Sequence, residues 1–142
     1  GGVIIMPGQT AHKKYKQVQV KTANNEKLLI MLYQGCVKFL RLAKKSIDEN
    51  DIEGTNNYII RAQDIIRELR NTLNMEKGGE IATNLSQLYD FMLRQLVEAN
   101  INKDSEKIEV VEDMMVELLD SWKQITNDQK KNEKESQLNV KG

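Results

Sequence analysis

The chain has 142 residues, of which 39% are hydrophobic and 30% charged, so we expect one domain built from elements with one face in water. Lys and Arg together number 21, as do Asp and Glu, which excludes the strong basic field that non-specific nucleic-acid binding requires. The single cysteine excludes an intrachain disulfide and is typical of a reducing compartment. We therefore expect a cytoplasmic protein that binds no nucleic acid.

The first apolar run, Val3–Met6, is too short for a secretory signal and far below the roughly 20 residues that span a bilayer. We expect neither an export signal nor membrane insertion. We expect Gly1 and Gly2 to be an expression remnant, with Met6 as a candidate for the native start. We expect these first residues to contribute nothing to the fold.

Helix-breaking residues are sparse. The only proline is Pro7, and the glycines that punctuate the interior are Gly54, Gly78 and Gly79. Apolar residues recur with the helical period in four segments, and none of these segments alternates with the period of two that a half-buried strand would show. The chain is therefore predicted to be all-α.

The first two predicted helices carry apolar stripes with steps of three and four residues. The first should begin after Asn24, its N-cap, and end at Asn50 and Asp51. Its core stripe consists of Leu28, Leu29, Leu32, Cys36, Phe39, Leu40, Ala43 and Ile47. The second spans roughly Glu53–Leu73, and its packing seam consists of Ile59, Ala62, Ile66, Leu69 and Leu73.

The third predicted helix runs from about Glu80 to Asn100, after a turn at Gly78 and Gly79. Its stripe consists of Ile81, Ala82, Leu85, Leu88, Tyr89, Met92, Leu96 and Ala99. The fourth follows Asp104, its N-cap, and its seam consists of Ile108, Val111, Met115, Leu118, Trp122 and Ile125. The residues that follow Thr126 are polar, so a helix there has nothing to bury, and we expect it to fray.

Short turns between four helices favour an antiparallel up-down-up-down four-helix bundle. We assign residues 22–126 to this bundle and residues 127–142 to a polar tail that we expect to be disordered. Residues 1–21 contain only a few apolar side chains after the first run, among them Tyr15, Val18 and Val20. This N-terminal segment is too sparse to form a core, so we expect it either to dock on the bundle or to remain mobile.

Catalytic and metal-binding side chains are scarce. His12, the only histidine, lies beside Lys13 and Lys14 in the polar N-terminal segment. Because no predicted helix contains a histidine, a di-iron site, a phosphorylated histidine and a nucleophile paired with a histidine are all excluded from the bundle. Cys36 lies on the core stripe and is expected to be a small buried hydrophobe. Nothing selects a catalytic carboxylate pair, and we expect no enzymatic activity, no cofactor and no metal site.

The first three predicted helices carry more apolar side chains than one packing stripe requires. The surplus consists of Met31, Tyr33, Val37, Tyr58, Ile60, Ile65, Tyr89, Phe91 and Leu93. One interpretation is a broad core with scattered exposed residues, which are normal on protein surfaces. The other is a groove for an amphipathic helix of a partner, anchored by a few buried side chains.

Segments before the first predicted helix and in all four predicted helices resemble one known family. They are, in chain order, Tyr15 with Val20–Ala23, Lys27–Leu40, Ala62–Leu69, Gly78–Leu85, Leu88–Met92, Leu96–Ile101 and Leu119–Trp122. In this order and spacing they are similar to the flagellar secretion chaperone FliS family. The family often has a proline where this chain has Asn25, which changes a favourable residue at a helix start.

The resemblance implies a cytoplasmic, non-enzymatic export chaperone. Such a protein would bind the disordered C-terminal segment of flagellin in a 1:1 complex, prevent premature polymerisation and support export by the flagellar type III secretion system. Components of the flagellar export gate are a second candidate partner. A cytoplasmic four-helix regulatory adaptor for another protein is the alternative, and a self-associating structural bundle is a more distant one.

The resemblance also implies that the N-terminal segment around Tyr15 covers an apolar part of the bundle until flagellin binds. Tyr33 and Tyr89 are expected at a half-exposed rim, because a phenol suits a position between apolar and wet surroundings. The full set of expected partner-binding residues is Tyr15, Val20, Met31, Leu32, Tyr33, Ile59, Ile66, Leu88, Tyr89 and Met92. Several of them also lie on the core seams.

Overall fold

The computed structural model describes the backbone of residues 11–141 and the side chains of residues 26–136. Its elements, in chain order, are α1 (Ala11–Asp48), α2 (Ile52–Asn71), α3 (Met75–Asn102) and α4 (Ser105–Lys141). Residues 11–141 contain no strand, so the prediction of an all-α fold is confirmed. Within this range, none of the helices combines the length and the apolar character that crossing a membrane would need.

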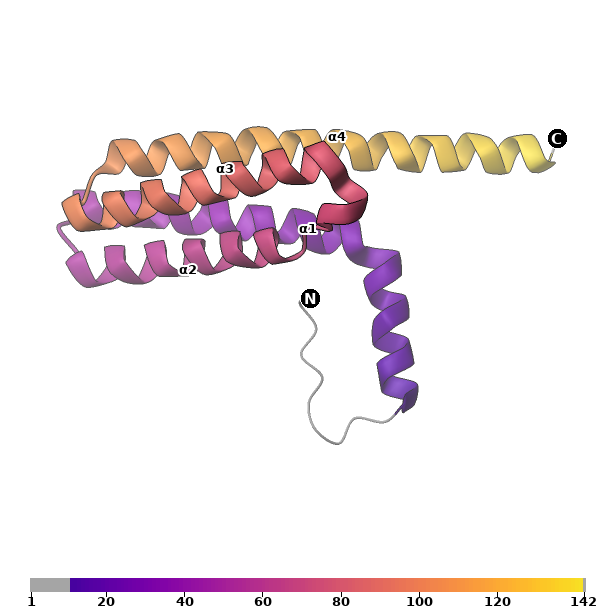
Figure 1. Cartoon of the computed structure of the whole chain (residues 1–142), viewed down its shortest axis with the longest axis horizontal. Helices are drawn as coiled ribbons and strands as arrows, with labels where there is room; N and C mark the ends of the chain where they lie inside the picture. Colours follow the sequence, from indigo (N-terminus) through magenta and orange to yellow (C-terminus); the bar gives the residue numbers. More distant parts are fainter. Residues whose placement is uncertain (1–10, 142) are drawn as a thin grey trace.

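The four helices form a closed ring of neighbours, in which α1 and α3 each pack on α2 and α4 (Figure 1). The turns between them are short, so successive helices run antiparallel and the predicted up-down-up-down bundle is confirmed. Each helix contributes fully buried residues to one core, for example Leu40 on α1, Ile66 on α2, Met92 on α3 and Met115 on α4.

The predicted seams mostly face this core. Ile59, Ala62 and Ile66 on α2 have no exposed surface, and neither do Val111 and Met115 on α4. On α3 the sequence left two adjacent residues as candidates for the same core position. Tyr89 takes that position at 2% exposure, whereas Leu88 turns outward at 37% exposure. The inclusion of Leu88 in the core stripe was therefore wrong.

Side-chain oxygens cap the helices where the chain turns. Asp51 accepts a hydrogen bond from the backbone N–H of Gly54 (2.9 Å) and Asn74 one from that of Lys77 (3.0 Å). Asp104, the predicted N-cap of the last helix, accepts one from the N–H of Glu106 (3.0 Å). These caps satisfy backbone donors that have no partner inside the helix.

The first helix begins at Ala11, so the predicted start after Asn24 was wrong. The segment from Ala11 to Gln34 contains neither proline nor glycine, and Asn25 stands where a proline would favour a helix start. The helix therefore continues through Asn24. In Figure 1, α1 is bent and its first turns project from the bundle.

Two further boundaries differ from the sequence predictions. α3 begins at Met75, before the paired glycines, but Gly79 breaks it with φ 52° and ψ −128°, so the predicted turn survives as a kink. α4 runs to Lys141 instead of fraying after Thr126 (Figure 1). The polar continuation is rich in Lys, Glu and Gln, which favour helix, and Gln124 donates a hydrogen bond to Asp128 one turn later (3.2 Å).

Candidate partner-binding site

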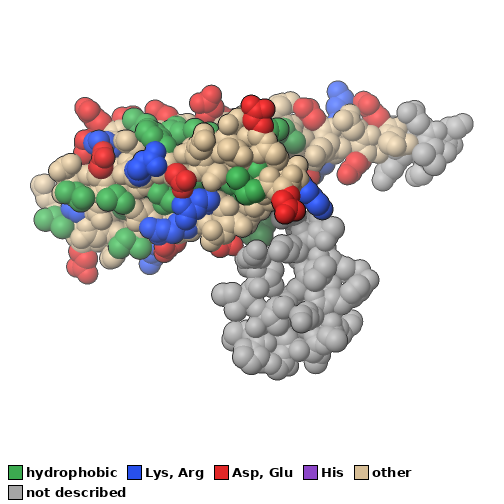
Figure 2. All heavy atoms as spheres, in the orientation of Figure 1, with side chains coloured by type: hydrophobic (Ala, Val, Ile, Leu, Met, Phe, Trp, Pro, Cys, Tyr) green, Lys and Arg blue, Asp and Glu red, His purple; other side chains and the backbone are tan. Residues whose placement is uncertain are grey.

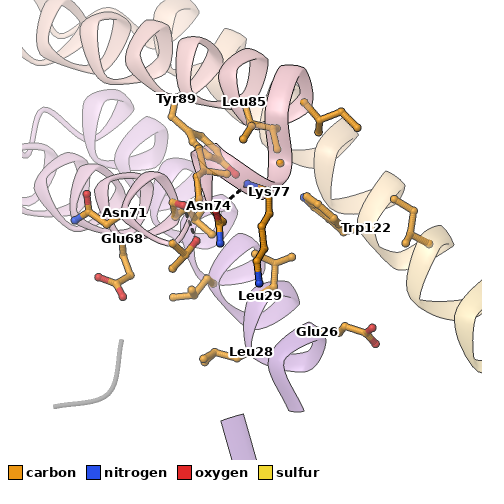
Figure 3. Close-up of a pocket in the computed structure, with 18 of the residues that line it drawn as sticks. Glu26, Leu28, Leu29, Glu68, Asn71, Asn74, Lys77, Leu85, Tyr89 and Trp122 are labelled. Carbon is orange, nitrogen blue, oxygen red and sulfur yellow. Dashed lines mark hydrogen bonds between the residues drawn. The ribbon is translucent and has the colours of Figure 1, made fainter. Parts of the chain in front are cut away.

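An open groove of about 630 Å³ lies at one end of the bundle, where the chain passes from α2 to α3 (Figure 3). We call it the end groove. All four helices contribute to it, and its lining is mainly apolar. The apolar lining residues are Leu28, Leu29, Leu32, Leu69, Leu73, Ile81, Ala82, Leu85, Tyr89, Trp122 and Ile125.

The groove exists because the four helices do not end at the same level. α2 stops at Asn71, whereas α1 and α4 both continue past this end of the bundle (Figure 1). Apolar residues near the end therefore lack a fourth helix to pack on, and Ile81 and Ile125 remain 70% and 45% exposed. Exposed apolar area of this kind is a place where another chain can gain hydrophobic energy.

Few charges line the end groove. They are Glu26 on α1, Glu68 on α2 and Lys77 near the start of α3, which together amount to a small negative excess (Figure 3). The electrostatic field of the groove is therefore too weak to select a highly charged ligand. The lining suits a mostly apolar, weakly charged segment.

Three aromatic side chains with polar groups meet beside this groove. The hydroxyls of Tyr33 on α1 and Tyr89 on α3 are hydrogen-bonded to each other, whereas the buried indole N–H of Trp122 on α4 has no hydrogen-bond partner among the described side chains. Burial raises the pKa of both tyrosines, so both hydroxyls stay protonated at neutral pH. Burial also raises the pKa of the nearby Cys36 thiol to about 12.

The expected half-exposed rim position of the two tyrosines was wrong. Tyr33 has no exposed surface and Tyr89 only 2%, because each hydroxyl finds a hydrogen-bond partner inside the bundle. Tyr89 nevertheless borders the end groove. It thus belongs to both the core and the candidate site.

The other expected partner-binding residues separate into four groups. Leu32 lines the end groove, and Met31 and Leu88 are exposed at 61% and 37% outside its lining. Three have no exposed surface and belong to the core, namely Ile59, Ile66 and Met92. Two lie on the described backbone of α1, but their side chains are outside the described residues, namely Tyr15 and Val20.

Sequence reasoning missed most of the groove lining. Leu29, Leu85, Trp122 and Ile125 were assigned only to packing seams, because their spacing is that of core residues. The lengths of the helices carried a signal that could have revealed part of this lining. The seam of the fourth helix continues to Ile125, beyond the level at which the second helix stops, so its last residues cannot all be covered.

Other apolar side chains are exposed along the bundle, in separate groups between charged residues (Figure 2). They include Ile60 on α2 and Phe91 on α3, two members of the predicted surplus, as well as Val97 and Ile101. A second groove of about 480 Å³ lies between α1 and α4, where Lys38, Arg41 and Lys123 border an apolar floor. The surplus apolar surface predicted from sequence is therefore present in part.

Known proteins are similar to this sequence over most of its length. The family model described as "Flagellar protein FliS" matches residues 8–129. The "Flagellar secretion chaperone FliS" of Bacillus subtilis is 40% identical over 123 residues, which cover 87% of this chain and 91% of the relative. Its namesake in Salmonella typhimurium is 39% identical over 119 residues, covering 80% of this chain and 88% of that protein.

A similar protein of Campylobacter jejuni, also named flagellar secretion chaperone FliS, is 36% identical over 124 residues, covering 87% of this chain and 97% of the relative. The match thus includes all four helices of the bundle and ends within the extended part of α4. Both the family model and these three relatives agree with the resemblance drawn from the motifs. The chain belongs to the FliS family of flagellar secretion chaperones.

Proposed function

We propose that this chaperone binds the disordered C-terminal segment of flagellin in the cytoplasm, in a 1:1 complex, and holds it for export by the flagellar type III secretion system. The observation that carries the proposal is the open, apolar and weakly charged end groove of a FliS-family bundle. Components of the export gate are proposed as a second partner, which would receive the loaded chaperone.

The physical basis is competition for an apolar strip. A flagellin segment that pairs with other flagellin molecules in a filament would instead fold as an amphipathic helix against the chaperone. Each apolar side chain that the segment buries fully in the groove contributes on the order of 1.5–3 kcal/mol. The entropy lost on ordering the segment offsets part of this gain, which leaves the complex weak enough to release its cargo.

No part of this role requires catalysis. Cys36 is fully buried and its thiol donates to the backbone carbonyl of Ala62 (3.8 Å), so it is not placed to act as a nucleophile. We propose that the protein acts by binding alone.

Calorimetric titration of the purified full chain with a flagellin C-terminal peptide tests the proposal. We expect 1:1 binding with a large negative heat-capacity change, since apolar surface is buried. A matched control peptide with the same composition in scrambled order should give no heat of binding. No binding of the native peptide would contradict the proposal and favour a regulatory adaptor for another protein.

We further propose that the N-terminal segment around Tyr15 and Val20 acts as a lid over apolar surface of the free chaperone. To do so, the first turns of α1 must swing about the bend seen in Figure 1 and fold back onto the bundle. Flagellin would then have to displace this segment before it binds.

Deleting the chain through Gln19 tests the lid. We expect the shortened protein to bind the flagellin peptide more tightly, because no segment has to be displaced, and hydrogen exchange near Tyr15 to become faster when flagellin binds the full chain. Unchanged affinity together with unchanged exchange would exclude a lid while leaving flagellin binding itself intact.

A further inference from the structure

The groove between α1 and α4, which we call the side groove, is separate from the end groove. Within residues 26–136, no residue lines both. The floor of the side groove is apolar: Val37 and Leu119 are buried at 5% and 7% exposure, and Leu42 and Val116 are half-buried. A partner in the side groove would therefore leave the end groove accessible.

The two helices that form the side groove carry opposite charge. Between Glu26 and Asp48, α1 contains five Lys and Arg residues and no carboxylate. Between Lys107 and Lys123, α4 contains five Asp and Glu residues and no Lys or Arg. The groove thus runs between a basic helix and an acidic one.

Several of these charges flank the groove and face solvent. Lys38 is exposed on the α1 side, where it borders the groove. Asp113 and Asp120 lie three residues before and four residues after Val116 of the floor, so the helical period places them along its outer edge. Glu117 is exposed beside them, and acidic side chains follow α4 in Figure 2. Within residues 26–136, Lys38 and these three carboxylates form no ion pair.

We infer that the side groove binds an amphipathic helix of a protein partner, which turns an apolar stripe to the floor, carboxylates toward α1 and Lys or Arg side chains toward α4. Burial of the apolar stripe supplies the affinity. The charges supply the selection, because a helix with one sign on both flanks is attracted by one helix of the groove and repelled by the other. This inference goes beyond the proposed function and does not depend on it.

The two flanks also select the direction of the bound helix. A partner helix turned end for end would put its carboxylates over α4 and its cations over α1. Each such helix therefore has one favoured N-to-C direction in the side groove.

Neither end of this chain supplies a helix of that kind. Residues 11–25 contain four lysines and no carboxylate, so they would bring cations to the basic flank. Residues 127–136 contain no apolar side chain that could cover the floor. The occupant is therefore a different polypeptide.

Three designed helical peptides of about 18 residues, roughly five turns, test the selection by charge. All share one leucine stripe. The first has Glu on one flank and Lys on the other, the second has Glu on both flanks, and the third has Lys on both. In calorimetry at low salt, we expect the first to bind the full chain about tenfold more tightly than the others, and high salt to reduce this advantage by screening. Equal affinities at low salt would overturn the inference.

Reversing one charge of the α1 flank locates the binding. We expect Lys38→Glu to weaken binding of the first peptide about fivefold and to strengthen binding of the all-Lys peptide by a similar factor. Lys134→Glu is the matched control, since Lys134 is an exposed lysine of α4 outside both groove linings. Equal effects of Lys38→Glu on all three peptides would overturn the inference.

Energy transfer from Trp122, the only tryptophan, tests the direction. Trp122 adjoins Lys123, which borders one end of the side groove. A dansyl group on the peptide end designed to lie at Lys123 should accept more energy than the same group on the other end, and equal transfer would contradict one fixed direction. A free chain that forms a dimer, which Lys38→Glu dissociates, would overturn the inference by assigning the groove to a second copy.

Discussion

Two glycines of this chain differ in whether the backbone conformation at their position requires a glycine. Gly35 lies in the interior of α1, and a Cβ added there would meet the Cδ1 atom of Ile65 at 3.5 Å, an ordinary contact distance. Gly79 lies at the kink of α3 with φ 52° and ψ −128°, a conformation that residues with a Cβ adopt only under strain. The first glycine is thus replaceable, whereas the second is required by the backbone.

Alanine substitutions should therefore change stability in opposite directions. We expect Gly35→Ala to raise the free energy of unfolding by about 0.5–1 kcal/mol, because the flexible glycine is lost from a helix interior. We expect Gly79→Ala to lower it by about 1–3 kcal/mol, the usual cost of such backbone strain. Urea unfolding of the two variants and the wild type measures both changes, and a stabilised Gly79→Ala would contradict the assigned kink.

The environment of single residues was the hardest property to predict from sequence. Tyrosines occur in cores, at half-exposed rims and in interfaces, and the position of a tyrosine in the apolar repeat does not distinguish these environments. Tyr33 and Tyr89 are buried because their hydroxyls meet each other, although 56 residues separate them in the chain. Such a pairing depends on how α1 and α3 are placed in the bundle, and a single sequence carries no record of that placement.

At the level of elements, apolar spacing was a reliable guide to the helices and their inner faces. The seams of α2 and α4 face the core because steps of three and four residues return side chains to one face of a helix. α3 was ambiguous, since its adjacent leucine and tyrosine at 88 and 89 both fit the period. Helix ends were less predictable at α1, where the segment before Glu26 carries few apolar residues but nothing that stops a helix.

The end groove is also a property of elements, because it depends on where each helix stops relative to its neighbours. Sequence predicts lengths and turns, but the axial level of one helix against another follows from packing of the whole bundle. Leu29 and Ile125 therefore look like core residues in the sequence and become groove residues in the structure. The motif resemblance anticipated a partner without locating the surface that would receive it.

At the scale of the whole molecule, one carboxylate joins the first helix to the last and so helps to close the ring. Glu112 on α4 lies 2.7 Å from Lys44 and 3.2 Å from Arg41, both on α1. Its side chain is only 11% exposed. Burial alone would raise the pKa of Glu112, but the hydrogen bonds and charges of Lys44 and Arg41 outweigh burial and hold the pKa below its ordinary value of 4.5.

A carboxylate whose pKa is lowered by folding stabilises the folded state at pH values above its unfolded pKa, and this contribution is lost as the pH falls through the folded pKa. We therefore expect Glu112→Gln to lower the free energy of unfolding by about 1–2 kcal/mol near neutral pH, the size of hydrogen bonds to a charged group. The difference from wild type should stay constant above the ordinary pKa of 4.5 and shrink below it.

Urea unfolding of wild type and Glu112→Gln at a series of pH values measures this difference, and Glu109→Gln is the matched control. Glu109 lies three residues earlier on the same helix and is exposed, so its loss should change stability little at any pH. If the free energy of unfolding of Glu112→Gln stayed below that of the wild type by the same amount down to the lowest pH measured, the effect would be assigned to packing. A deficit that disappears with protonation shows that the bridge between α1 and α4 is ionic, and that acid weakens the bundle where its first and last helices meet.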